Sequence, residues 1–170
     1  MDFLPRWLRG ARLEPKLSCR RSVWRRGVRE LALRTGGYRE SGAFLLGASN
    51  AKRRRIEAFL FYDDLDPQCF RNGIVEFDGR KLGELWSHCR HRGLTVIADV
   101  HVHPGDFHQS TSDQHNPMIP QVGHMALILP YFAARGTLPG EIGIYEYLGN
   151  RRWANHSAAG AAIMRVARWA

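Results

Sequence analysis

The feature that most constrains this chain is the stretch Leu94–His103, in which apolar residues alternate with other types and two histidines end the run. Alternation with a period of two predicts a β-strand whose successive side chains point to opposite faces. His101 and His103 therefore share a face, where both imidazoles can reach one ion. We expect Leu94, Val96, Ala98, Val100 and Val102 on one face and Thr95, Ile97, Asp99, His101 and His103 on the other.

The rest of the pattern predicts one α/β (α+β) domain built on a mixed sheet. A chain of 170 residues can bury a core without disulfides, and we assign residues 1–21 to an N-terminal arm and 22–170 to the domain. Strands are expected at 42–47, 56–62, 74–77, 94–103, 125–129, 142–147 and 151–154. Helices are expected at 22–34 with Ser22 as its cap, after Asp78 as a second cap, near 110–115 as a short turn, and at 158–169.

The two histidines and a carboxylate from the following polar loop, Asp113, form a ligand set suited to a catalytic metal. Two imidazoles and one carboxylate leave the fourth position of a tetrahedral zinc ion open for water. Such a centre also needs a general base for the water proton and a hydrogen-bond donor for the developing oxyanion. Ser110, three residues before Asp113, is placed to be that donor, whereas several acidic residues could be the base.

The pattern His101-Val102-His103-Pro104, followed by Ser110-x-x-Asp113, resembles the JAMM motif of the JAB/MPN metallopeptidases. That family has a glutamate before a small-apolar strand, and Glu40 in Glu40-Ser41-Gly42-Ala43-Phe44-Leu45-Leu46-Gly47 matches it. The resemblance implies one Zn²⁺ held by His101, His103 and Asp113, with Glu40 as general base and Ser110 as oxyanion donor. It also implies a curved mixed sheet flanked by helices, similar in layout to cytidine deaminases.

The resemblance further implies hydrolysis of the peptide or isopeptide bond after the C-terminal tail of a ubiquitin-like protein. The segment between Pro130 and Glu141 is too short for the insertion with which specialised eukaryotic members read chain linkage. The loop between His103 and Ser110 is also short, with Gln109 where many members have Pro. We therefore expect a compact, cytoplasmic prokaryotic type, from a bacterial ubiquitin-like conjugation or antiviral system, with E1/E2-like enzymes from the same operon as partners.

Other interpretations of the histidine strand fit less well. The first metal strand of amidohydrolases looks similar, but that fold needs a (β/α)₈ barrel of about 250 residues. A metallo-β-lactamase site needs an Asp and a His closer to the second histidine than Asp106 and His108. Two structural histidines satisfied by neighbours would not explain Ser110, Asp113 and the Glu40 segment together. Within the family, a DNA-associated or scaffold role without peptidase activity stays the alternative.

Composition excludes some classes of protein. No window has the run of about eighteen apolar residues that a membrane-spanning helix needs, so no membrane partner is expected. The net charge of +9 lies partly in the N-terminal region and in Lys52-Arg53-Arg54-Arg55, which could meet acidic partner surfaces. Nucleic acid is not expected as a partner, because no aromatic residues interleave with the basic run.

Cys19, Cys69 and Cys89 are too widely spaced for a zinc framework, and we interpret them as reduced thiols that are buried or free. His115 and His124 read as surface or core histidines.

Overall fold

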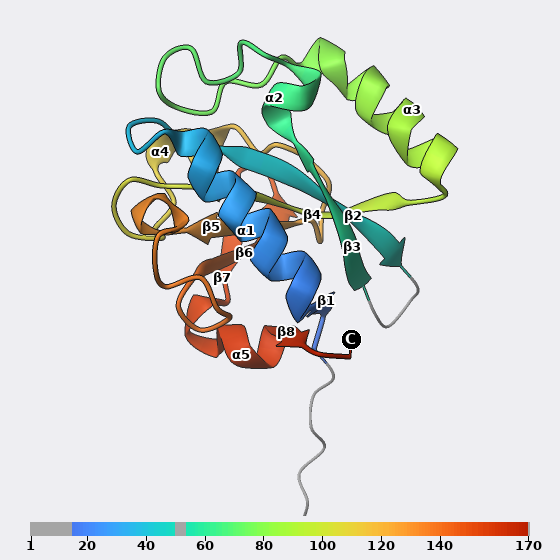
Figure 1. Cartoon of the computed structure of the whole chain (residues 1–170), viewed down its shortest axis with the longest axis vertical. Coiled ribbons are helices and arrows are strands. Elements are labelled where there is room, and N and C mark those ends of the chain that lie inside the picture. Colours follow the sequence, from blue (N-terminus) through green and yellow to red (C-terminus); the bar gives the residue numbers. More distant parts are fainter. Residues whose placement is uncertain (1–14, 50–53, 170) are drawn as a thin grey trace, which may run out of the picture.

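Strand β4 (Thr95–Val102), which holds His101 and is followed at once by His103, lies inside an eight-stranded mixed sheet (Figure 1). The computed structural model describes residues 15–49 and 54–169. The strand order is β7-β6-β5-β4-β2-β3-β1-β8, with β4 antiparallel to β2 and parallel to β5. The other strands are β1 (Leu17–Arg20), β2 (Gly42–Ser49), β3 (Arg54–Phe61), β5 (Met125–Leu129), β6 (Gly143–Gly149), β7 (Arg152–Asn155) and β8 (Met164–Ala167).

Helices cover both faces of this sheet. The longest, α1 (Arg21–Thr35), covers one face, while α2 (Tyr62–Leu65) and α3 (Leu82–Arg92) lie over the other (Figure 1). The short helices α4 (Thr111–His115) and α5 (Gly160–Ile163) follow β4 and β7, and 3₁₀ turns span Gly79–Lys81, Tyr131–Ala133 and Ser157–Ala159. The structure confirms a curved mixed sheet flanked by helices.

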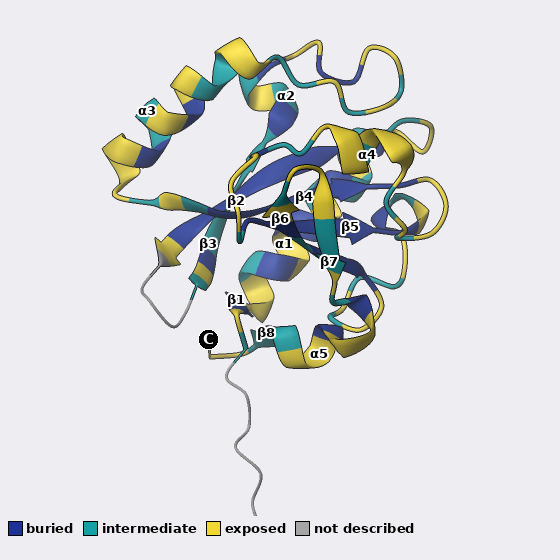
Figure 2. Ribbon diagram, turned by 180° about the vertical axis from the view of Figure 1, so that it is seen from behind, coloured by how far each residue is buried: buried dark blue, intermediate teal, exposed yellow. Residues whose placement is uncertain are grey.

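Two hydrophobic cores lie on the two faces, and the central strands β2, β4 and β5 between them are largely buried (Figure 2). The α1-side core joins Trp24, Val28 and Leu31 of α1 to inward residues of seven strands, all except β7. The α3-side core includes Phe44, Leu46, Tyr62, Cys69, Phe70, Leu85, Cys89 and Ile119. Burial of apolar surface on both faces explains why the central strands read as apolar runs.

A β-bulge corrects the predicted faces of β4. The pairing with β2 moves from Leu45↔Ala98 to Leu46↔Val96, which leaves Ile97 as an extra residue. Ile97 and Ala98 both reach the α1-side core, while Val96 packs against the α3-side core. The predicted faces are therefore wrong for Leu94 to Ile97 and correct from Ala98 onwards. One inserted residue moves every side chain on one side of it to the opposite face of the sheet.

Two local predictions, the cap of the first helix and the strand at 74–77, are wrong. Helix α1 begins at Arg21 with Arg20 as N-cap residue, and no side chain caps it, so Ser22 is not the cap. The strand predicted at 74–77 does not form, because its amides bond elsewhere: Val75 N donates to Glu40 and Glu76 N to the carbonyl of Cys69. Asp78 does act as a cap and accepts a hydrogen bond from Arg80 N at 2.9 Å.

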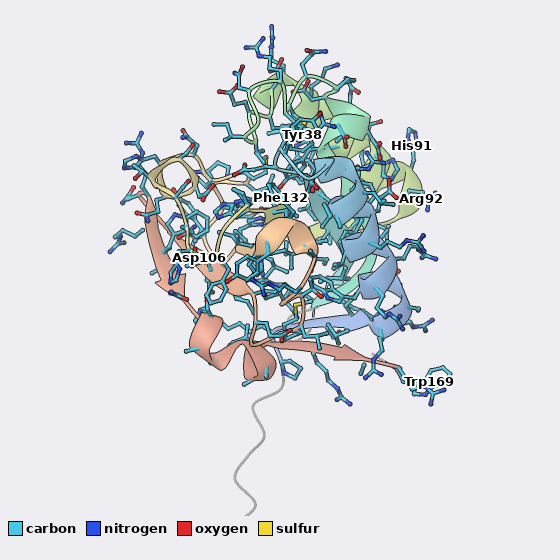
Figure 3. The ribbon with its side chains drawn as sticks, turned by 60° about the vertical axis from the view of Figure 1, so that its left-hand side comes forward. Tyr38, His91, Arg92, Asp106, Phe132 and Trp169 are labelled. Atoms are coloured by element: carbon cyan, nitrogen blue, oxygen red, sulfur yellow. The ribbon has the colours of Figure 1, made fainter. Side chains whose placement is uncertain are left out.

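The C-terminal prediction of one helix over 158–169 is wrong. A 3₁₀ turn and the four-residue α5 lead directly into β8, which pairs in parallel with β1. Trp169 extends beyond β8 and away from the body (Figure 3). Strand β1 lies between β3 and β8 in the sheet, so Leu17–Arg20 of the expected arm are part of the domain; residues 1–14 lie outside the described part.

The three cysteines are free and buried, as predicted. Burial raises the pKa of the Cys19 and Cys69 thiols to about 12, which keeps both unreactive. Of the basic run, Lys52 and Arg53 lie outside the described residues, Arg54 donates to the carbonyl of Gly123, and Arg55 pairs with Glu57. Within residues 15–49 and 54–169, no helix has the length and apolar character needed to cross a membrane.

Candidate metal centre

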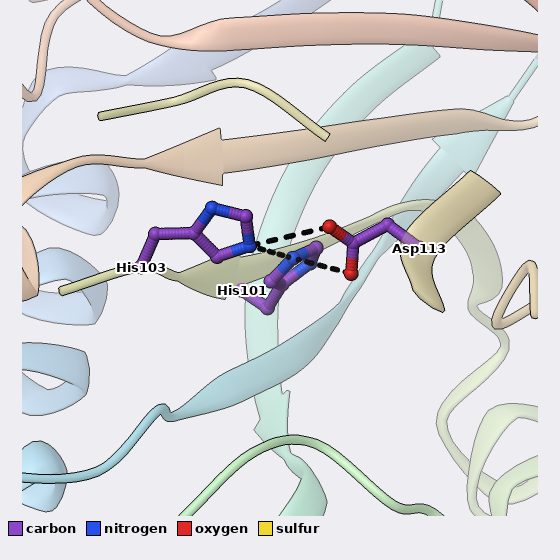
Figure 4. Close-up of side chains that lie close together, drawn as sticks. All are labelled: His101, His103 and Asp113. Carbon is purple, nitrogen blue, oxygen red and sulfur yellow. Dashed lines mark hydrogen bonds and ion pairs between the residues drawn. The ribbon is translucent and has the colours of Figure 1, made fainter. Parts of the chain in front are cut away.

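Three side chains converge where β4 ends against α4 (Figure 4). The Nε2 atoms of His101 and His103 are 2.9 Å apart, and each lies 3.3 Å from one carboxylate oxygen of Asp113. Both histidines are 8 % exposed as whole residues, whereas Asp113 is partly open to solvent. The two histidines reach the cluster from the same side of the strand, as their spacing predicts.

This donor set fits a zinc ion. Ligand atoms at the usual zinc distances in a tetrahedral site are separated by about 3.3 Å, close to the separations seen among these three side chains. Two facing Nε2 atoms and a carboxylate, held together in a largely buried place, need a shared cation or proton to avoid repulsion. His101, His103 and Asp113 are thus the residues that could hold a metal.

A capping box positions Asp113. Ser110 is the N-cap residue of α4, and its Oγ accepts a hydrogen bond from Asp113 N at 3.2 Å. In return, Ser110 N donates to Asp113 Oδ2 at 2.7 Å. The Ser-x-x-Asp spacing therefore has a local structural cause, since N-cap and N3 residues satisfy each other's amides at a helix start. This signature could have been read from the sequence.

Glu40 lies two residues before the start of β2 and faces the same cluster. Its Oε2 accepts a hydrogen bond from Val75 N at 2.9 Å, and its Oε1 is 3.9 Å from His103 Nε2. The Glu40 amide donates to the carbonyl of Gly73, so the glutamate is tied twice to the segment before α3. One carboxylate oxygen is thus fixed while the other points towards the candidate ligands.

A left-handed turn supports the end of the histidine strand. Tyr131, Phe132 and Ala133 all have φ between 53° and 57°, a conformation that costs non-glycine residues roughly 1–2 kcal/mol each. Tyr131 N donates to the carbonyl of Gly105, and Phe132 N to that of His103. Strained backbone of this kind persists where neighbours hold it in place, and here it holds the residues beside a candidate ligand.

A buried polar network is centred on Asp99, which lies two residues before His101 in β4. Asp99 shares the face of His101 and accepts from His124 Nε2 at 2.6 Å and Tyr62 Oη at 3.4 Å. All three side chains are nearly inaccessible, so the carboxylate depends on these partners for its polar contacts. The sequence leaves His124 as a surface or a core histidine; the structure buries it, and the sequence has no signal for its pairing with Asp99.

The electrostatics of the cluster keep Asp113 ionised. Burial alone would raise the pKa of this carboxyl, but hydrogen bonds with His101 and His103 outweigh burial and hold the pKa well below its usual range. For His101, burial would lower the pKa, and the interaction with Asp113 reverses that direction and raises it. Asp113 therefore offers a charged oxygen ligand across the physiological pH range.

An open cleft of about 730 Å³ gives access to the cluster. One wall comes from the segment 71–79, and the other comes from the loop around α4. His101, Asp113 and Asp99 line the cleft between these walls. The cleft thus reaches two of the three candidate ligands, His101 and Asp113.

The other histidines and acids near the motif do not join the cluster. Asp106 and His108 pair with each other at 3.0 Å on an exposed loop, and His115 is an exposed residue of α4. A hydrogen bond from Tyr145 Oη to the carbonyl of Phe107 ties this loop to β6. Of the residues proposed from sequence, the structure brings together Glu40, His101, His103 and Asp113, with Ser110 one helical turn from the ligand.

Known proteins resemble this chain over part of its sequence and over most of its fold. No family model matches the chain. The chain is 31 % identical over 62 residues to the probable metalloprotease y4jG of Sinorhizobium fredii. That match covers 36 % of this chain and 38 % of the relative's own length.

Solved structures share the fold more widely. A protein of Desulfitobacterium hafniense matches with a TM-score of 0.61 and 14 % identity, over 89 % of this chain and 92 % of that one. A protein of Salinibacter ruber matches with a TM-score of 0.54 and 17 % identity, over 81 % and 87 % of the two chains. A JAB1/MPN domain protein of Archaeoglobus fulgidus matches with a TM-score of 0.43 and 15 % identity, over 76 % and 88 %. The first two likenesses show a common fold across most of the chain.

Proposed function

We propose that this chain is a zinc-dependent peptidase that hydrolyses an amide bond. The observation that carries the proposal is the convergence of His101, His103 and Asp113, with Glu40 Oε1 3.9 Å from one of the imidazoles. The partial match to a probable metalloprotease supports the same class of reaction. A buried three-ligand set with a carboxylate beside it is the arrangement that hydrolytic zinc sites use.

Zinc, when bound, would supply a water of pKa about 7 and polarise the substrate carbonyl. Glu40 is the group that takes the proton from the attacking water and passes it to the leaving amine. Its hydrogen bond from Val75 N fixes one oxygen and leaves the other towards the ligand cluster. The carboxylate therefore keeps its orientation while it gains and loses the proton.

Ser110 is proposed as the donor to the oxyanion. Its Oγ uses a lone pair to accept from Asp113 N, so its hydroxyl proton stays free to donate. Because the same residue caps α4, the donor and the ligand Asp113 move as one unit. An aligned donor that needs no reorganisation contributes most where charge develops.

The finer proposal is a JAMM-type isopeptidase or tail-processing peptidase for a ubiquitin-like protein. Such tails are extended, and the open cleft of about 730 Å³ beside His101 and Asp113 has room for one. The resemblance of the motif carries this proposal, together with E1/E2-like partners in a bacterial conjugation or antiviral system.

The test uses the purified protein with candidate ubiquitin-like fusions, with zinc and with a chelator. We expect cleavage after the tail that stops on chelation and returns with zinc. Glu40→Gln should retain zinc and substrate binding while kcat falls by about 10²–10⁴, the usual range for losing general base catalysis. The matched control is Glu57→Gln on β3, because this glutamate pairs with Arg55 and does not line the cleft, so kcat should be retained.

Cleavage that survives chelation, or an undiminished kcat in Glu40→Gln, would reject the zinc peptidase. Cleavage of other peptide bonds but of no ubiquitin-like fusion would reject only the finer proposal.

A further inference from the structure

A second hollow lies away from the metal cleft. This groove of about 700 Å³ is bounded by the start of α1, the loop 137–139 and the α5–β8 segment, and it shares no lining residue with the metal cleft. Glu40 follows the far end of α1, which spans about 22 Å as a helix of this length. In Figure 1, β8 and α5 lie near the beginning of α1, and α4 lies near its end.

The groove is lined by three arginines and by no acidic residue. Arg21 and Arg25 come from successive turns of α1, and Arg165 comes from β8. All three are exposed, and in the described part of the chain their guanidinium groups make no ion pair or hydrogen bond. The first turn of α1 contains no acidic residue, so the positive end of the helix dipole adds to their charge.

The chain gains no stability from this arrangement. Cations at a helix start oppose the dipole, and like charges one turn apart repel each other. On the same helix, by contrast, Arg34 binds Glu30, Asp63 and Asp64. A cluster of unpaired arginines around a groove therefore indicates a ligand that carries negative charge.

The floor and rim of the groove are apolar. Trp24 and Met164 close the floor and are each 1 % exposed, while Val166 is partly buried and Leu138 is 53 % exposed on the rim. A small inorganic anion would leave this surface unused. A ligand that fits must combine negative charge with apolar groups.

An unpaired strand edge completes the surface. Strand β8 is last in the sheet order, and its only partner among the described strands is β1. An extended segment laid along such an edge gains main-chain hydrogen bonds, and its alternate side chains reach opposite sides. Acidic and apolar side chains in alternation would match the arginines and the apolar rim.

We infer that this groove binds an extended, acidic segment of a partner protein. Its carboxylates pair with Arg21, Arg25 and Arg165, and its apolar side chains contact Leu138 and Val166. Arginine suits this task because its planar group can bind a carboxylate through two hydrogen bonds. The groove thus anchors a partner about one helix length from the candidate metal centre.

Single-stranded nucleic acid fits the groove less well. Such ligands stack their bases on exposed aromatic rings, but the ring of Trp24 is buried and its Nε1 donates to the carbonyl of Thr137. Trp169, which is 81 % exposed, does not line the groove. The lining offers charge and aliphatic contacts but no stacking surface.

The experiment measures fluorescence anisotropy of a labelled peptide of about ten residues, in which Asp or Glu alternates with Val or Leu, at about 0.15 M salt. We expect the full chain to bind it, and the counterpart with Asn and Gln to bind at least about tenfold more weakly. The double variant Arg21→Glu/Arg25→Glu should lose at least about tenfold in affinity. It should remain folded, because acids at a helix start favour the dipole.

The matched control is Arg26→Glu/Arg29→Glu, which makes the same charge change on exposed residues of the same helix that do not line the groove. This control should keep most of the affinity. Equal losses in both variants would show unspecific attraction and overturn the inference, as would no binding by the unaltered chain. Tighter binding of an oligonucleotide, or a dimer in light scattering that Arg21→Glu/Arg25→Glu converts to monomer, would assign the groove to another occupant.

Discussion

At the scale of single residues, each side chain near the candidate centre has a structural contact besides its proposed role. Ser110 caps α4, Asp113 closes the capping box, and Glu40 accepts from Val75 N. His103 is tied through its backbone to Leu129 and to the left-handed turn. A substitution at these positions therefore changes both chemistry and local structure, and variants must separate the two.

Removing the carboxylate of Asp113 should lower zinc occupancy. Asp113→Ala takes away one of three ligands and leaves the two imidazoles facing each other, so we expect a large loss of bound zinc in elemental analysis after dialysis. Asp106→Ala is the control, because this exposed aspartate pairs only with His108 and lies on the surface loop (Figure 3). Full zinc occupancy in Asp113→Ala would rule out its role as a ligand.

A pair of Ser110 variants separates the cap from the oxyanion donor. Ser110→Ala removes both and should lower kcat about 10²–10³-fold, with about 1 kcal/mol of stability lost with the cap. Ser110→Gly also lacks the hydroxyl, yet glycine at an N-cap costs only a few tenths of a kcal/mol. A kcat lowered equally in both variants indicates the donor, whereas a normal kcat in Ser110→Gly would leave Ser110 only the cap.

At the scale of elements, two bulges shape the middle of the sheet. The bulge in β4 at Ile97 sets which residues share the face of His101. The second bulge lies in the β2–β3 pairing, where the register shifts between Leu46 and Gly47. There the carbonyl oxygen of Arg55 occupies the place that a Cβ on Gly47 would take. The register shift between β2 and β3 thus depends on a missing side chain at Gly47.

Two glycine substitutions should have opposite signs. Gly47→Ala forces the Arg55 backbone to move and should lower the free energy of unfolding by about 1–3 kcal/mol, as overpacking does. Gly83→Ala lies inside α3 with open space around it, so it should raise that free energy by about 0.5–1 kcal/mol. Urea unfolding of both variants measures the difference, and a stable Gly47→Ala would contradict the bulge.

At the scale of the whole molecule, the sheet curls until distant strands meet. Lys16, just before β1, reaches Glu146 of β6 at 2.7 Å, although four strands separate β1 from β6 in the sheet order. Trp24 of α1 reaches the carbonyl of Thr137 in the loop before β6. The α1-side core lies inside this curl, and β8 adds Met164 to it.

Truncation of Met164 tests the C-terminal strand. Its side chain is 1 % exposed, so Met164→Ala should cost about 2–5 kcal/mol through lost burial and the cavity left behind. Leu33→Ala is the control, because Leu33 is 64 % exposed on α1 and should change stability by less than about 0.5 kcal/mol. Equal thermal midpoints for the two variants would show that β8 does not pack in the core.

Much of the architecture follows from local pattern. The alternation after Ile97 determines the shared face of His101 and His103, and the Ser-x-x-Asp spacing determines a helix start that holds Asp113. Both depend on neighbours within a few residues, which a sequence shows directly. The central strands β2, β4 and β5 were likewise predicted, because each is an apolar run buried on both faces.

Only the tertiary structure decided the rest, because the partners lie far apart along the chain. The segment 158–169 has helical spacing, but pairing with β1 gives its end a strand's hydrogen bonds and burial. The segment 74–77 has strand composition, but Glu40 and Cys69 take its amides. The arginine groove likewise exists only because the start of α1 and β8, from opposite ends of the described chain, lie side by side. The local sequence pattern indicates which face of a segment is apolar. Which element packs on that face depends on contacts between residues far apart in the sequence.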